Sequence, residues 1–200
     1  MKKLVPLTIL MAGALSGFSQ GVVSFQNSTV FVTPAIPSDS GRLVYNVGSI
    51  LSTNGGVKLS GTNFVAELFV GAAGMTSFDS LTPIQSSISR FRLSSSANIG
   101  KWNTTTVTGG FNSGIDLGVP IGTVVTLGVA VWDLRDTPTY SRNGIHGESQ
   151  LFSFTAADPG GAASGFVMEG FQSFALVPEP SAIALGLMGV AGLLLIRRRK

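Results

Sequence analysis

Apolar and polar residues alternate with a period of two in several short stretches, and no stretch keeps helical spacing over three turns. In residues 64–70 every second residue, starting with Phe64, is apolar, as in a strand with one buried face. Residues 123–133 form the longest run and are apolar on most of both sides. We therefore expect a central strand over 123–133 and a half-buried strand over 64–70.

Weaker strand signals recur through residues 20–176, separated by turn sequences rich in Gly, Asn and Asp. Further strands are expected at 22–25, 29–32, 43–47, 88–93, 104–108, 151–155 and 171–177, with turns at Asn54-Gly55-Gly56, Asn143-Gly144 and Asp158-Pro159-Gly160-Gly161. About eight to ten short strands without helical spacers predict an all-β fold, an antiparallel β-sandwich of jelly-roll type.

The two ends of the chain differ from this middle part. Residues 1–19 combine Lys2 and Lys3 with an apolar run and then small residues up to Ser19. This order is typical of a secretory signal peptide, with cleavage expected after Ser19. An N-terminal anchor or buried helix is disfavoured, because the run is short and contains Pro6.

Residues 182–196 form an apolar, Gly-rich segment that ends at Arg197, Arg198, Arg199 and Lys200. The segment is apolar on all sides, which predicts a single transmembrane helix and not an amphipathic core helix. At ~1.5 Å per residue it falls short of a ~30 Å hydrocarbon core, but arginine side chains and local thinning can make up the difference. The basic tail should remain on the cytoplasmic side.

Pro178, Glu179 and Pro180 stand directly before that segment. The two prolines favour an extended, accessible conformation there. This triplet, the short apolar helix and the terminal Arg cluster together resemble the PEP-CTERM sorting signal, over residues 177–200. The resemblance implies recognition by an exosortase, a membrane transpeptidase-like cysteine enzyme that cuts near the motif, and delivery to the cell surface or extracellular matrix of an exopolysaccharide-producing Gram-negative bacterium.

Parts of residues 20–176 also resemble an ectodomain that recurs among PEP-CTERM proteins. The similar segments are Gly21–Asn27, Ala66–Gly71, Ala130–Asp133 and Gly170–Phe174. These motifs are hydrophobic and structural, so the resemblance assigns no catalytic residue.

Charge is concentrated at the two ends. The formal net charge is +3, but six of the 13 Lys and Arg residues lie at positions 2, 3 and 197–200. Residues 20–176 carry seven basic and nine acidic residues, a net charge of −2. A nucleic-acid-binding protein would spread its cations over a folded face, so that class is disfavoured.

Few residue patterns point to catalysis. There is no Cys and one histidine, His146, in a segment without a nucleophile elbow, so we expect His146 to be a loop residue. A glycosidase would need two carboxylates, and Glu67, Glu148 and Glu169 are the glutamates outside the sorting motif. Glu67 lies opposite the apolar positions of its strand, which favours solvent exposure.

Metal and cofactor sites are equally sparse. Asp133 and Asp136 could supply calcium ligands from a loop at a strand end, although a turn bond from Asp133 to Arg135 fits the sequence as well. No phosphate-binding loop or dinucleotide fingerprint occurs, so no cofactor is expected.

Aromatic residues offer one binding hypothesis. Trp102, Trp132, Tyr45 and Tyr140 could form a platform for stacking sugar rings, with core packing the better interpretation for Trp132. Trp102 is the first of them to test.

The leading hypothesis is a non-enzymatic surface or matrix protein that is anchored briefly in the inner membrane and sorted by an exosortase. A carbohydrate-binding module for the matrix polysaccharide is the alternative.

Overall fold

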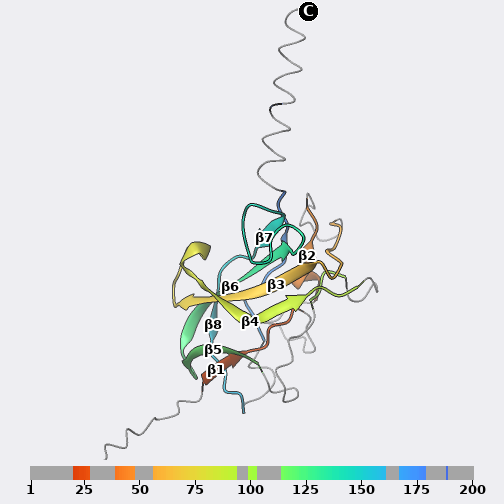
Figure 1. The fold of residues 1–200 in the computed structure, drawn as a ribbon. Coiled ribbons are helices and arrows are strands. Elements are labelled where there is room, and N and C mark those ends of the chain that lie inside the picture. Colours follow the sequence, from red (N-terminus) through yellow and green to blue (C-terminus); the bar gives the residue numbers. More distant parts are fainter. Residues whose placement is uncertain are drawn as a thin grey trace, which may run out of the picture.

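The structure is a computed structural model that describes residues 20–27, 39–47, 56–93, 99–102, 114–160, 167–178 and 188. Strands dominate these residues, as the all-β prediction requires (Figure 1). The strands are β1 (Gln20–Val23), β2 (Val44–Tyr45), β3 (Phe64–Ala72), β4 (Thr82–Arg90), β5 (Ile115–Pro120), β6 (Val124–Asp133), β7 (His146–Glu148), β8 (Phe152–Thr155) and β9 (Phe174–Ala175). Two short 3₁₀ helices, η1 (Asp39–Arg42) and η2 (Phe78–Ser80), lie between them.

Five strands form the largest sheet, with β3 and β6 at its centre. These two strands pair antiparallel from Phe64 opposite Asp133 to Ala72 opposite Val125. β4 borders β3 on the far side, while β7 and β8 lie one after the other along the free edge of β6. The central strands are therefore paired on both sides over most of their length.

Two smaller pairs contain the other strands of the described residues. β1 and β5 are antiparallel, whereas β2 and β9 are parallel. The N–H groups of Val22 and Ala157 each donate to the other residue's carbonyl, at 2.9 and 3.1 Å, which ties β1 to the chain just after β8.

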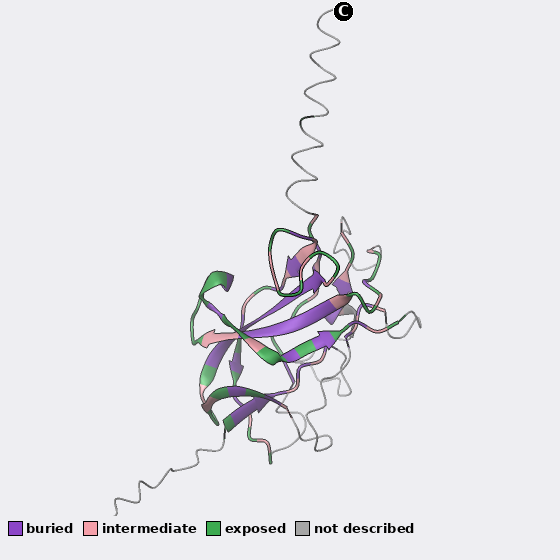
Figure 2. Ribbon diagram, viewed as in Figure 1, coloured by how far each residue is buried: buried purple, intermediate pink, exposed green. Residues whose placement is uncertain are grey.

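The main core lies on one side of the five-stranded sheet, which we call the inner face. Ala66 and Leu68 of β3 and Val129 and Val131 of β6 point to this side. They pack in one cluster with buried residues of the smaller strand pairs, including Val23, Val44, Ile115, Leu117 and Phe174. The opposite side, the outer face, carries Glu67, Phe69, Ala130 and Trp132. Figure 2 shows that β3 and β6 are buried along most of their length.

The two strongest strand predictions are confirmed, because β3 covers 64–72 and β6 covers 124–133. Short strands also lie within three of the weaker predicted segments, near 44, 152 and 174, and β1 overlaps the predicted 22–25 at residues 22 and 23. β4 was predicted only in part, since it begins at Thr82 and not at Ile88. The predicted strands at 29–32 and 104–108 lie outside the described residues.

β5 and β7 have no counterpart among the predicted strands. β5 alternates cleanly between buried and exposed residues, but it contains Gly118 and ends at Pro120. β7 is His146-Gly147-Glu148, which has little strand preference of its own and forms by pairing with β6. Both strands depend on long-range partners that local sequence does not reveal.

The predicted signal peptide and most of the predicted transmembrane helix fall outside the described residues. Within the described part of the chain, no helix is long and apolar enough to span a membrane. Met188 is helical, and 64% of the residue is exposed.

Candidate functional site

The outer face of the sheet holds a buried carboxyl group at its centre. Glu67 lies in the middle of β3, and only 2% of the residue is exposed. The expected solvent exposure of Glu67 is therefore wrong. Its side chain does lie opposite the apolar set, but neighbouring segments cover that side of the sheet as well.

The Glu67 carboxyl has an unusual environment. Its Oε1 is buried and has no hydrogen-bond partner among the described residues. Burial raises the pKa of Glu67 from 4.5 to about 7, because removing a carboxylate from water disfavours its charged form. Near neutral pH, Glu67 is therefore poised between its acid and its anion.

A pocket of about 120 Å³ lies beside Glu67 and is partly open to solvent. Its walls come from three parts of the chain. They are Glu67 and Phe69 of β3, Pro83, Gln85 and Ile88 of β4, and Thr139 and Tyr140 of the loop between β6 and β7. We call this space the Glu67 pocket.

Tyr140 is the centre of an aromatic group on the outer face. Its ring lies edge-on to Phe69 and Trp132, with centroids 5.6 and 5.8 Å away, and 6.1 Å from Phe78. The indole N–H of Trp132 donates to the Thr137 carbonyl at 3.2 Å, which fixes the loop against the sheet. These contacts hold residues 134–145 over the outer face.

Charged groups surround the tyrosine hydroxyl. Tyr140 donates a short hydrogen bond to Glu148, whose carboxylate also accepts from Arg142 Nε at 2.7 Å. Arg142 additionally pairs with Asp79 at 2.6 Å. Burial, followed by the neighbouring Glu148 carboxylate, raises the pKa of Tyr140, so its hydroxyl is a proton donor at neutral pH.

A glycosidase would need two glutamates side by side, and the fold brings two of the three candidates, Glu67 and Glu148, into one row of the sheet. Ala130 pairs with Glu67 on one side and Glu148 on the other, so the two glutamates share a row and their backbones lie roughly 10 Å apart. However, Glu148 is not a wall of the Glu67 pocket and is bound by Tyr140 and Arg142. Glu169 is exposed in a turn away from these strands.

His146 was expected in a loop but is the first residue of β7. Its Nδ1 is 2.8 Å from the Gly144 carbonyl, and its ring lies edge-on to Tyr140 at 6.2 Å. His146 is therefore a neighbour of the aromatic group on the outer face.

The proposed sugar-stacking residue, Trp102, is wrong for that role because it is completely buried. Its ring packs against Phe25, Phe91 and Phe171 at 5.0 to 5.9 Å, and its indole N–H donates to the Phe25 carbonyl at 3.1 Å. A sugar cannot reach this ring in the folded protein. Trp132 is also buried, as expected, while Tyr45 is half-buried in β2.

Buried Asn27 connects the Trp102 segment to the rest of the core. Its side-chain amide donates to the carbonyls of Arg42 and Gly100, at 3.0 and 2.7 Å, and accepts from the Trp102 backbone N–H at 3.2 Å. One side chain thus joins three segments that are distant in sequence.

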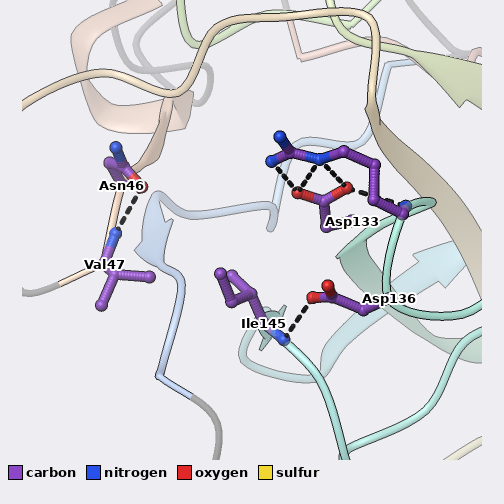
Figure 3. Close-up of polar contacts among 6 residues, drawn as sticks. Asn46, Val47, Asp133, Asp136 and Ile145 are labelled. Atoms are coloured by element: carbon purple, nitrogen blue, oxygen red, sulfur yellow. Dashed lines mark hydrogen bonds and ion pairs between the residues drawn. The ribbon is translucent and has the colours of Figure 1, made fainter. Parts of the chain in front are cut away.

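The candidate calcium ligands each have a protein partner (Figure 3). Both carboxylate oxygens of Asp133 accept from the Arg135 guanidinium, and Oδ1 also accepts from the Arg135 backbone N–H at 2.9 Å. Asp136 accepts from the Ile145 N–H at 3.1 Å. The turn bond to Arg135 is the arrangement that the structure contains, and it lowers the pKa of Asp133. Calcium binding at these residues would have to displace that ion pair.

The described part of the fold continues to the edge of the sorting motif. The Val177 N–H donates to the His146 carbonyl at 2.7 Å, and Pro178 follows directly. Glu179, Pro180 and Arg197–Lys200 lie outside the described residues.

Comparisons with protein-family models, curated proteins and solved structures found no significant match. The Glu67 pocket was not among the sites predicted from the sequence. Its one available signal was a charged residue flanked by apolar residues within a strong strand, at Glu67.

Proposed function

We propose that this protein is an exported, exosortase-sorted component of the cell surface or extracellular matrix, associated with exopolysaccharide and without catalytic activity of its own. Residues 1–19 direct export, residues 20–176 are the exported domain, and residues 177–200 are the sorting signal. In this proposal the segment 182–196 spans the inner membrane transiently, and the basic tail 197–200 holds it on the cytoplasmic side.

The described residues next to the motif support this proposal. Val177 is still hydrogen bonded to β7, but 46% of it is exposed. Pro178 has no N–H and cannot continue the ladder. A processing enzyme needs a segment that it can reach without unfolding the domain, and Val177, directly before Pro178-Glu179-Pro180, is exposed at the surface.

The exported domain is proposed to be a jelly-roll-like sandwich. The core between the five-stranded sheet and the β1–β5 and β2–β9 pairs supports two layers. Two residues that the sequence offered as ligand contacts have structural roles instead. Trp102, the candidate for sugar stacking, fills the core, and Asp133, the candidate for calcium, binds Arg135. The carbohydrate-module alternative has therefore lost the residue on which it depended.

The test is replacement of Pro178, Glu179 and Pro180 by alanine in a Gram-negative host that has an exosortase. We expect the normal protein to appear at the surface with the mass of a processed chain. The variant should accumulate in the inner membrane with its C-terminal segment intact. Intact-mass measurement and cell fractionation report the two properties.

Gln172→Ala is the matched control, because Gln172 is exposed and lies a few residues before the motif. It should be processed normally. If the triple variant has the same mass and location as the normal protein, the sorting proposal is wrong.

A further inference from the structure

The Glu67 pocket combines a buried carboxyl with a free space next to it. Glu67 is 98% buried, and its Oε1 has no partner among the described residues. A buried polar atom without a hydrogen bond costs on the order of 1–3 kcal/mol. Glu67 forms part of the pocket wall, so a rotation of its carboxyl toward the pocket would let a ligand donate a hydrogen bond to it and remove that cost.

The other walls of the pocket restrict the kind of ligand. Phe69, Pro83 and Ile88 present apolar surface, and Tyr140 adds a second aromatic ring. Gln85 and Thr139 are neutral polar groups at the rim. An anion would meet Glu67 without a cation in the wall to balance it, so the pocket disfavours anionic ligands.

A cation with an alkyl stem satisfies every part of this surface. An ammonium group can donate to Glu67 and also interact with the rings of Phe69 and Tyr140. Its alkyl chain can contact Pro83 and Ile88. The volume of about 120 Å³ is somewhat below the ~150 Å³ of a cavity that accepts benzene, which limits the ligand to a few carbons.

We propose that the Glu67 pocket binds the primary-ammonium end of a short alkylamine, with Glu67 as its counter-ion. The ammonium group belongs either to a free amine or to a lysine side chain of a protein partner. This site is independent of the sorting signal, so it stands or falls separately from the proposed function.

Binding is coupled to a proton. Below pH 7 most Glu67 is neutral, and it must release its proton to become the counter-ion. The released proton passes to the buffer, and charge in the pocket is balanced by the ammonium group. Affinity should therefore be about tenfold higher at pH 8 than at pH 6, with little change above pH 8.

Other titratable or charged groups lie on the surrounding elements. They are Asp79 in η2, Arg90 on β4, Arg135, Asp136, Tyr140 and Arg142 in the loop, and His146 and Glu148 on β7. Glu67→Gln keeps all of them while removing the carboxylate. Subtracting the pH dependence of affinity in this variant from that of the unmodified chain therefore isolates the contribution of Glu67.

The experiment is isothermal titration calorimetry of the full chain in non-ionic detergent, with n-butylammonium as the probe. At pH 6, each bound probe should release nearly one proton, which is measured by repeating the titration in buffers of different ionisation enthalpy. Glu67→Gln should bind at least about tenfold more weakly and release no proton. Glu169→Gln, at an exposed position, should behave as the unmodified chain.

A second set of probes distinguishes the alternatives. n-Butanol has the same number of non-hydrogen atoms but no charge, and it should bind more weakly than n-butylammonium. Nα-acetyl-lysine methylamide tests the lysine source, since its backbone must stay outside the pocket. Its binding through Glu67 would support a protein partner, whereas binding of n-butylammonium alone would support a free amine.

Three results would overturn the proposal. They are absence of saturable n-butylammonium binding, equal binding of n-butanol, or unchanged binding in a folded Glu67→Gln variant. The proton count on the unmodified chain remains decisive if that variant does not fold.

Discussion

The inner face of the five-stranded sheet is apolar from Phe64 to Val70 on β3 and from Val125 to Val131 on β6, whereas the outer face places an ionisable carboxyl between apolar and aromatic neighbours. On the inner side, polar Asn27 is buried as deeply as Glu67, but its amide makes three hydrogen bonds. On the outer side, Glu67 Oε1 has none among the described residues. Equal burial therefore has opposite energetic consequences on the two sides.

This difference indicates separate roles for the two faces. Buried polar groups with complete hydrogen bonding fix one arrangement of the chain. A buried group without a partner costs stability, and such groups are a feature of binding and catalytic sites. The inner face is thus the structural half of the domain, and the outer face is where a ligand site is expected.

The largest expected effect comes from Trp102→Ala on the inner side. The change removes an indole that contacts three aromatic rings, and it leaves a cavity in the core. We expect the free energy of unfolding to fall by about 4 kcal/mol. Urea denaturation followed by far-ultraviolet circular dichroism measures this loss.

Leu93→Ala is the control, because Leu93 is 68% exposed. It should change stability by less than about 0.5 kcal/mol. A loss below about 1 kcal/mol for Trp102→Ala would contradict the buried position of the ring.

Glu67→Gln should abolish a pH dependence of stability that originates on the outer face. Between pH 4.5 and 7 the folded protein retains a proton on Glu67 that the unfolded chain has lost. Stability should therefore fall by about 1.4 kcal/mol per pH unit across that window, and by about 3 kcal/mol in total. Below pH 4.5 and above pH 7 this contribution is constant.

Urea titrations from pH 4 to pH 8 measure the effect. The stability difference between Glu67→Gln and the unmodified chain should grow with pH in favour of the variant, and it should level off above pH 7. Glu169→Gln should leave the dependence of stability on pH unchanged. If the stability of Glu67→Gln changed with pH in the same way as that of the unmodified chain, Glu67 would not be buried as a neutral acid.

How far the sequence could predict these two faces depends on the range of the interactions. The alternation in 64–70 and the apolar run in 123–133 located β3, β6 and the inner face, because periodicity is a local property. The same alternation assigned Glu67 to solvent. That error arose because Tyr140 lies more than 70 positions away in the sequence, and only the fold brings its loop over β3.

Trp102 is a second residue whose long-range contacts could not be predicted from the local sequence. Its neighbours in sequence are polar, which suggested an exposed aromatic residue. Its partners in the fold are Phe25, Phe91 and Phe171, from three separate segments. By contrast, the ion pair of Asp133 with Arg135 joins residues two positions apart, and it was one of the two arrangements predicted for Asp133 from the sequence.

Gly128→Ala should disturb the outer face without touching the inner core. A Cβ at Gly128 would lie 2.7 Å from the Phe78 ring and 3.0 Å from Leu81 and Leu151. These side chains must move outward, so we expect a loss of about 2 kcal/mol and a weaker near-ultraviolet circular dichroism signal. In Gly160→Ala the nearest contact would be 3.4 Å, to Asp158, and its stability should be nearly unchanged.

Tyr140→Phe should have the smallest effect, because it removes one hydroxyl and keeps the ring that packs on Phe69 and Trp132. Glu148 retains its bond from Arg142, so its carboxylate is not left without a partner. We expect a loss of about 1 kcal/mol in urea denaturation, against a smaller change for Tyr45→Phe on β2. A loss as large as that of Trp102→Ala would mean that the hydroxyl network, and not ring packing, holds the loop on the outer face, and the division between the two faces would then have to be abandoned.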